Sequence, residues 1–255
     1  MADNELSLLF QAGSSPGGAR PKALVEDEKG AYLAKFASAG DRLDVVSLEA
    51  AAMEIGRQAG VEPAVSTLIQ LGNKIKCLLV KRFDIGEAGG RNHLISMKSL
   101  LKADDYYNAG YKDLTDAIKH ISSQPGHDLQ RLYRQMVFNT MIGNTDDHLK
   151  NFVMLHDDHG WRLSPAFDLI PNIGFNREHV LRIGLDNRPP KAETLLVEAK
   201  HFGIKRRQQA MEIIKEIHGA VSKWPDVFRQ CHVPEKDAEK IGKDIARRLK
   251  VTEIR

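Results

Sequence analysis

Residues 143–168 read GNTDDHLKNFVMLHDDHGWRLSPAFD and hold the densest group of chemically useful side chains in this 255-residue chain. Asp146 and Asn151 are separated by four residues, and a further carboxylate, Asp168, follows shortly after. In phosphotransferase catalytic loops with this spacing, the Asp receives a hydroxyl proton, while the Asn and a later Asp hold Mg²⁺. The spacing alone also suits a surface turn, because Asn, Asp and Gly are common in turns.

The segments on either side of Asp146 favour a site over a turn. A run of apolar residues at helical spacing ends at Gly143, which predicts a buried helix that leads into the Asp146 loop. Residues 151–155 and 161–163 then read as the two strands of a hairpin, which would return Asp168 towards Asp146. His156 and His159 lie in the turn of that hairpin without other ligands, so we do not interpret them as a metal site. The helical run consists of Leu129, Leu132, Tyr133, Met136, Val137 and Met141.

The composition is that of an ordinary soluble globular protein, with 42% apolar and 28% charged residues. A net charge of +3 is too weak to indicate a nucleic-acid binder. The two cysteines, Cys77 and Cys231, lack metal-ligand spacing, and Cys77 sits in an apolar run typical of a core. No apolar stretch is long enough to span a membrane, and the acidic start is unlike a signal peptide. We therefore expect a cytoplasmic protein without a membrane segment.

The first part of the chain reads as a small sheet with one helix packed across it. A helix capped by Ser47 and stopped by Gly60 is predicted between the first hairpin and the second. Two hairpins are expected, one around the turn 27–30 and one with the two-residue loop Gly72-Asn73. The predicted strands are 6–10, 23–26, 31–36, 65–71 and 76–83.

After Gly86 the composition shifts through EAGGRN, a plausible hinge, to segments with helical periodicity. Among these, 207–221 and 235–250 are the clearest helices. The sequence thus predicts an α+β chain of two lobes: a β-rich N-lobe over residues 1–85 and a mainly helical C-lobe over residues 86–255.

Lys35 interrupts the otherwise apolar run AYLAKF. Kinases place a Lys on such a strand, where it forms ion pairs with the α- and β-phosphates of ATP and with a Glu of the following helix. Glu49 or Glu54 would be that partner. The alternative is an edge-strand lysine that protects against aggregation.

Two more segments are candidates for nucleotide contact. Gly17-Gly18-Ala19-Arg20-Pro21-Lys22 lacks the Walker and G-x-G-x-x-G patterns, although small residues let backbone N–H groups approach phosphate and Lys22 adds charge. The same composition suits a flexible linker. Lys81-Arg82-Phe83 precedes the predicted hinge, where an ATP-binding cleft reads adenine through backbone groups, but a basic strand end is an equal alternative.

With these blocks in order, the chain resembles the HipA-like serine/threonine kinases, which are toxins of bacterial toxin–antitoxin modules. The resemblance covers nearly the whole chain, and its most specific part is GNTDDHLKNF. The matching blocks are SSPGGARPKAL, YLAKF, LVKRFD, RNHLISMKSLL and GNTDDHLKNF followed by LSPAFDL. The resemblance implies a two-lobed protein-kinase-like fold with ATP and Mg²⁺ in the cleft, and transfer of the γ-phosphoryl group to a Ser or Thr hydroxyl.

Site roles follow from the resemblance residue by residue. Asp146 is the implied catalytic base, and Asn151 and Asp168 are the implied Mg²⁺ ligands. The implied ATP-binding residues are Gly17, Gly18, Ala19, Arg20 and Lys22 in the covering loop, Lys35, the adenine segment Lys81, Arg82 and Phe83, and His148 and Lys150 in the catalytic block.

The resemblance also implies regulation and partners. Ser15, or Ser14 beside it, falls where the family carries an autophosphorylated serine. The implied substrate is a protein of translation such as an aminoacyl-tRNA synthetase, and the implied partner is a helix-turn-helix antitoxin, so that any DNA contact is indirect. The family's usual chain has an extra N-terminal subdomain, so we expect a separate small protein that supplies it, a compact form, or a truncation.

Two other functions remain compatible with the residues. A small-molecule phosphotransferase shares the Asp-x-x-x-x-Asn logic. A nucleotide-binding co-repressor subunit of an operator complex is the non-enzyme alternative, although the low net charge weighs against it.

Overall fold

The computed structural model describes residues 20–72, 75–86, 89–104, 108–172, 178–184 and 190–254. The predicted strand 6–10 lies outside these ranges. So do the covering-loop residues Gly17, Gly18 and Ala19, and both candidate phosphoserines, Ser14 and Ser15.

A four-stranded antiparallel sheet in the order β1-β2-β4-β3 forms one side of the molecule. Its two hairpins match the prediction, since the alternating apolar residues of each strand pair across a short turn. Leu71 pairs with Ile75, so the second loop holds three residues instead of the predicted two. β4 also ends at Lys81, two residues before the predicted Phe83. The strands are β1 Lys22–Asp27, β2 Gly30–Phe36, β3 Ser66–Leu71 and β4 Ile75–Lys81.

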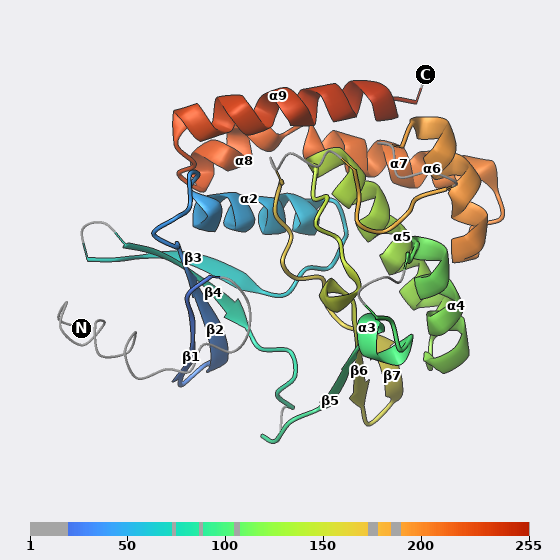
Figure 1. The fold of residues 1–255 in the computed structure, drawn as a ribbon, viewed down its shortest axis with the longest axis horizontal. Helices are drawn as coiled ribbons and strands as arrows, with labels where there is room; N and C mark the ends of the chain where they lie inside the picture. Colours follow the sequence, from blue (N-terminus) through green and yellow to red (C-terminus); the bar gives the residue numbers. More distant parts are fainter. Residues whose placement is uncertain are drawn as a thin grey trace.

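The helix α2, Val45–Gln58, crosses this sheet (Figure 1). Its cap is Asp44 and not the predicted Ser47: the Asp44 carboxylate accepts a hydrogen bond from the Ser47 backbone N–H at 3.1 Å. Ser47 lies in the first turn and donates its own hydroxyl to Asp44 at 2.9 Å. The chain stops the helix near Gly60, which has φ +67°, as expected for a left-handed terminator.

Helices make up most of the remaining chain and gather on the other side of α2, with α9 along the top and α4 to α7 to the right in Figure 1. The helices are α3 Met97–Leu100, α4 Tyr111–Ile121, α5 Pro125–Ile142, α6 Ala192–Glu198, α7 Arg207–Val221, α8 Trp224–Gln230 and α9 Glu235–Thr252, with 3₁₀ turns η1 Leu149–Asn151 and η2 Ala199–Phe202. Within the described ranges, none of the helices is both long and apolar enough to cross a bilayer.

A second, three-stranded sheet in the order β5-β6-β7 lies beside α3 and α4 in Figure 1. The predicted hairpin that precedes Asp168 is present, but its turn is tighter than expected, because Asp157 already pairs with Gly160. β5 is a short strand that the periodicity did not indicate. The strands are β5 His93–Ser96, β6 Val153–Asp157 and β7 Gly160–Leu163.

One continuous apolar core runs from β4 through α2 into α5, α7 and α8. The helix α5 is the predicted buried helix, and Leu132 and Met136 on it are fully buried. Each such side chain contributes about 1.5–3 kcal/mol on burial. Cys77 lies on the internal strand β4 and is buried with Ala34 and Phe36, which confirms that it is a core side chain, and burial raises the pKa of its thiol to about 11. The helix α2 is therefore held between the sheet and the helical lobe.

Candidate functional site

Lys35 lies between two carboxylates that come from distant parts of the chain. Its Nζ is 2.5 Å from Glu49 Oε1 on α2 and 2.9 Å from Asp168 Oδ1, after β7. Of the two expected helix partners the structure selects Glu49, because Glu54 bonds Arg57 on the outer face of the helix. This contact joins the sheet, α2 and the segment that carries Asp168.

The charges at this junction reinforce one another. Burial raises the pKa of Asp168, but Lys35 outweighs it through its charge and hydrogen bond, with help from Lys22 and His148, and the pKa of Asp168 ends below its usual value. Burial opposes the charged form of Lys35, yet Glu49 and Asp168 raise its pKa overall. Lys35 is thus a cation and Asp168 an anion at neutral pH. The Asp168 side chain remains 47% exposed, so it is accessible to a ligand.

Glu49 differs from Asp168, because burial has the larger effect on it. Its side chain is 7% exposed, and burial raises its pKa despite the attraction of Lys35. A buried carboxylate with one cationic partner is stable only while that partner stays in place. The position of Lys35 is therefore coupled to the position of α2.

The predicted catalytic loop, which carries Asp146, begins where α5 ends. Gly143 caps α5 with φ +81°, a left-handed conformation that turns the chain away from the helix axis. Asn151, in η1, donates from Nδ2 to the backbone carbonyl of Asp146 at 2.9 Å. Because only the amide nitrogen can donate to a carbonyl, Asn151 Oδ1 is left as an acceptor or metal ligand. The side chain of Asp146 itself is exposed.

Asp147, the second acid of the NTDDH loop, is a buried anchor that sequence reasoning missed. Its carboxylate accepts hydrogen bonds from the Tyr111 hydroxyl at 2.7 Å and His179 Nδ1 at 2.8 Å. The backbone N–H groups of Val180 and Leu181 add two more, at 3.0 and 3.3 Å. A carboxylate with this many donors is well satisfied although it is fully buried.

The anchor extends into α5. Asn139 Nδ2 donates to the Tyr111 hydroxyl oxygen at 3.1 Å, and Asn144 Nδ2 donates to Asn139 Oδ1, also at 3.1 Å. The doubled Asp of the loop was the only local signal for this role, and it did not distinguish the exposed Asp146 from the buried Asp147. Asp146 therefore faces solvent, whereas Asp147 holds the loop in place through its buried hydrogen bonds.

The other two residues of the predicted catalytic block, His148 and Lys150, differ in their relation to Asp168. His148 is half-buried and its charge acts on Asp168, and its buried Nδ1 has no hydrogen-bond partner among the described residues. Lys150 is exposed on η1 and forms no ion pair within the described ranges. The structure therefore brings His148, but not Lys150, to Asp168.

Two residues in the described part of the covering loop, Lys22 and Arg20, carry charges that act on the junction. Lys22 is paired directly opposite Lys35 across β1 and β2, so both side chains are on the same face of the sheet. Its charge acts on Asp168. Arg20 forms an ion pair with Asp41, at 3.2 Å, in the loop before α2, and its charge also acts on Glu49.

In the predicted adenine segment, two of the three backbone N–H groups are occupied. Lys81 donates its N–H to the Val65 carbonyl at 2.8 Å, and Arg82 donates to the Ala31 carbonyl at 2.9 Å. Phe83 packs against Phe167, with ring centroids 5.8 Å apart. Phe83 is thus the residue of this trio that contacts the segment leading to Asp168.

The side chain of Arg82 is also engaged. Its guanidinium forms two hydrogen bonds with Asp84, of 3.0 and 2.6 Å, and Arg91 contacts the same carboxylate at 3.1 Å. These contacts hold the connection between the lobes in one geometry.

A family model described as the HipA-like C-terminal domain matches residues 14–224. Two Sinorhizobium fredii proteins, named "Putative kinase Y4mE" and "Putative kinase Y4dM", are each 30% identical to this chain, over 120 and 141 residues. These alignments cover 42% and 50% of this chain but only 29% and 34% of the two relatives. The chain therefore matches about a third of the length of these curated relatives.

Two solved structures share the fold. HipA of Shewanella oneidensis, solved with HipB and operator DNA of its toxin–antitoxin system, superposes with a TM-score of 0.76 at 17% identity, over 99% of this chain and 70% of that one. The Helicobacter pylori proinflammatory kinase CtkA gives 0.57 at 17% identity, over 86% of this chain and 94% of that one. The predicted α+β, two-lobed, kinase-like fold is confirmed.

Proposed function

Because this chain belongs to the family of HipA-like C-terminal domains, we propose that it is an ATP- and Mg²⁺-dependent protein kinase that phosphorylates Ser or Thr hydroxyls. The observation that carries the proposal is the contact of Lys35 with both Glu49 and Asp168. Kinases require the equivalent Lys–Glu pair and the metal-binding Asp to be in place together.

Lys35 binds the phosphates of ATP, and Lys22 and His148 add positive charge near the same point. Asn151 Oδ1 and the exposed Asp168 carboxylate hold Mg²⁺, which prefers oxygen ligands and is commonly bound by one or two side chains together with substrate phosphates. When bound, Mg²⁺ neutralises charge that develops on the phosphates. Phe83 and Phe167 offer apolar surface to the adenine.

Asp146 accepts the proton of the acceptor hydroxyl. The hydroxyl oxygen then forms its bond to the γ-phosphorus, while the bond between that phosphorus and the β-phosphate oxygen breaks and ADP leaves. Asn151 orients the loop through its hydrogen bond to the Asp146 carbonyl, and Asp147 anchors the loop through its hydrogen bond with Tyr111. The reaction depends on positioning and on charge, both of which these residues supply.

The partners and regulation are inferred from the family. The S. oneidensis relative was solved with HipB and operator DNA, so we assign a helix-turn-helix antitoxin to this chain as well, with DNA contact only through it. The substrate is a protein of translation such as an aminoacyl-tRNA synthetase, and Ser15 or Ser14 is the autophosphorylation site. We place this complex in the cytoplasm.

The test uses labelled ATP and a cell lysate, with the wild type, Asp146→Asn and Asp168→Asn. We expect a labelled protein band with the wild type and a loss of about 10²–10⁴-fold in both variants. Asp158→Asn, an exposed acid in the β6–β7 turn, is the matched control and should retain full activity. A labelled metabolite in place of a protein band would support a small-molecule phosphotransferase, and full activity of Asp168→Asn would refute the proposed site.

A further inference from the structure

A cavity of 930 Å³ lies beside Asp146. Its walls are the loop and first turn leading into α2, the segment 170–172 after Asp168, and one face of α9. A volume of this size is large enough for several side chains of a bound segment. Because the exposed Asp146 lies in its wall, whatever occupies the cavity is next to the proposed catalytic base.

The cavity is strongly cationic. Lys240, Lys243 and Arg247 are three and four residues apart, so they share one face of α9, and Arg42 adds a cation from the opposite wall. In the described part of the chain, Arg42, Lys240 and Lys243 are in no ion pair. The wall carries six cations, Arg20, Arg42, Lys240, Lys243, Arg247 and Arg248, against three acids, Asp41, Asp146 and Asp244.

Two of those three acids are already neutralised. Asp41 is paired with Arg20, and Asp244 is paired with Arg247 and Arg248. Asp146 is the third acid, and the proposed reaction uses it. The remaining cations therefore attract a negatively charged occupant and would repel a basic one.

The cations of α9 are held in a fixed place relative to the catalytic loop. Arg248 is buried, bonds Asp244 at 2.6 Å and donates to the Thr140 carbonyl of α5 at 3.3 Å. A Cβ on Gly143 would come within 3.0 Å of Arg248 Nε, so the two helices meet closely where the loop begins. This packing keeps the charged face of α9 at a constant distance from Asp146.

The uncharged wall favours a protein over a nucleic acid. It is mainly aliphatic, with side chains such as Val45, Leu48 and Ile170, and no aromatic side chain of the described residues lines the cavity. Single-stranded nucleic acids need aromatic faces on which their bases stack. An aliphatic and cationic cavity instead suits a peptide that has acidic and apolar side chains.

We propose that this cavity binds the acceptor segment of the substrate and selects one in which acidic residues flank the phosphorylated Ser or Thr. The inference rests on the proposed kinase activity, because it assumes that the acceptor hydroxyl reaches Asp146 from this cavity. It assigns Arg42, Lys240 and Lys243 as specificity-determining residues.

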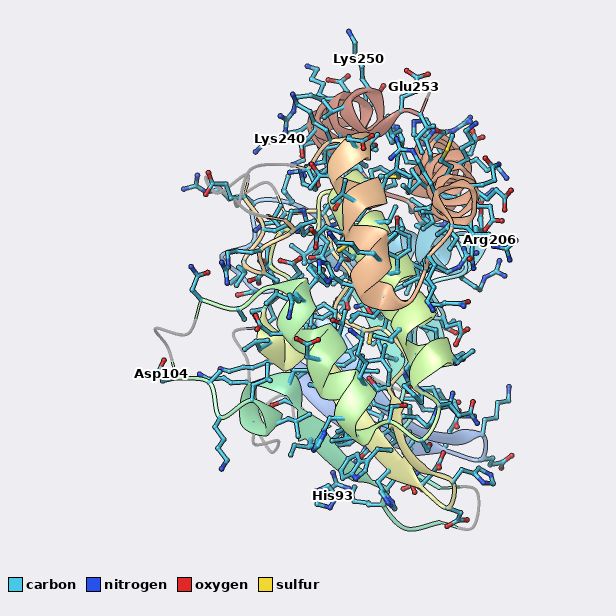
Figure 2. All side chains as sticks on the ribbon, turned by 90° about the vertical axis from the view of Figure 1, so that its right-hand side faces the viewer. His93, Asp104, Arg206, Lys240, Lys250 and Glu253 are labelled. Atoms are coloured by element: carbon cyan, nitrogen blue, oxygen red, sulfur yellow. The ribbon has the colours of Figure 1, made fainter. Side chains whose placement is uncertain are left out.

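The test compares three peptides that share one Ser and one aliphatic neighbour, and that differ only in flanking Glu, Gln or Lys residues. Binding is measured by fluorescence anisotropy without ATP, and phosphorylation with ATP and Mg²⁺. The charge-reversal variant is Lys240→Glu with Lys243→Glu, and the control is Lys250→Glu. Figure 2 shows that Lys250 projects from α9 in a different direction from Lys240, and Lys250 does not line the cavity.

We expect the Glu peptide to bind and react about tenfold better than the Gln peptide, and this preference to weaken with salt. The double variant should lose the preference or reverse it, whereas Lys250→Glu should keep it. An unfolding midpoint equal to that of the wild type would exclude a general loss of structure.

Different results would refute the acidic acceptor preference and the proposed kinase activity. Phosphorylation without preference among the peptides, or an unchanged preference in the double variant, overturns the acidic acceptor but leaves the kinase intact. Charge-dependent binding of the Glu peptide without any phosphorylation supports the cationic, anion-binding cavity and overturns the proposed kinase activity. Tighter binding of a short RNA than of the Glu peptide, lost in the double variant, would replace the peptide with a nucleic acid and overturn the inference.

Discussion

His179 donates from Nδ1 to Asp147 Oδ2 over 2.8 Å, and the exposed fractions of the two side chains are 2% and 0%. Since a carboxylate can only accept, Nδ1 of the ring carries a proton. This bond ties the loop of Asp146 to the segment 178–184, which otherwise contacts the loop through backbone bonds such as Val180 N–H to the Thr145 carbonyl. The direction of the exposed Asp146 thus depends on its buried neighbour.

We predict that Asp147→Asn lowers kcat by about 10²-fold, because a displacement of about 1 Å at a catalytic group has this cost. The KM for ATP should stay unchanged, since Lys35 and Asp168 do not contact Asp147. A purely structural role would reduce the fraction of folded enzyme, so ATP-binding stoichiometry and kcat per binding site are measured together. An unchanged kcat per site would contradict the positioning role.

Tyr111→Phe should have a smaller effect in the same direction. Burial, followed by the Asp147 charge, raises the pKa of Tyr111 well above its ordinary value, so its hydroxyl stays protonated and donates to Asp147. Its removal leaves three donors on the carboxylate and costs about 1 kcal/mol of stability. Urea unfolding and kcat of this variant should both lie between the wild type and Asp147→Asn. A kcat below that of Asp147→Asn would mean that Tyr111 acts by another route.

Glu49→Gln should reduce phosphorylation by about 10²-fold, because Lys35 loses the charge that holds it towards the phosphates. The matched control is Glu54→Gln on the same helix, where the carboxylate bonds Arg57 and Gln58 on the outside of the helix. Initial rates at saturating ATP, together with the KM for ATP, measure both. Equal rates for the two variants would show that the ion pair with Lys35 is dispensable.

The sequence predicted the elements whose signals are local. The spacing of Asp146 and Asn151, the apolar run of α5 and the isolated Lys35 each stand out within a short window, and the structure has the predicted helix, strands and fold. The predicted N-cap of α2, Ser47, was wrong. Asp44 and Ser47 are both good capping residues, and only the position of the first helical turn distinguishes them.

Contacts between distant segments could not be predicted in the same way. Tyr111, Asp147 and His179 lie on α4, the catalytic loop and the segment 178–184, and no pattern in the sequence connects them. Likewise, the cationic face of α9 lies near Asp146 because Arg248 packs against Gly143 and α5 where the loop begins. Tertiary packing decides both, and local propensity does not report it.

Asp84 should make stability depend on pH in the acid range. The hydrogen bond from Arg82 is the main cause that lowers the pKa of Asp84 below its ordinary value, and Arg91 adds to it. A carboxylate whose pKa is lower in the folded state stabilises the fold above its unfolded pKa of about 3.9, and loses this contribution as pH falls through the folded pKa.

The unfolding free energies of the wild type and Asp84→Asn should therefore differ most near neutral pH and converge as the pH falls below about 4. Urea unfolding at several pH values measures the difference, and Asp158→Asn should show no such trend. A difference between wild type and Asp84→Asn that stays constant down to low pH would contradict this assignment.

Gly242 in α9 is the position where a single methyl group should be costly. Alanine normally stabilises a helix by about 1 kcal/mol relative to glycine, but a Cβ here would come within 2.0 Å of Trp224 Cη2. The Trp224 ring packs on Phe228, with centroids 5.3 Å apart, so it cannot move without loosening the contact between α8 and α9. We expect Gly242→Ala to destabilise the protein by about 1–3 kcal/mol and to shift the fluorescence of Trp224, one of two tryptophans. Gly219→Ala in α7, where no atom lies within 4 Å of the added Cβ, should instead stabilise it by up to about 1 kcal/mol. If both alanines stabilise the protein equally in urea unfolding, Trp224 does not restrict this helix contact.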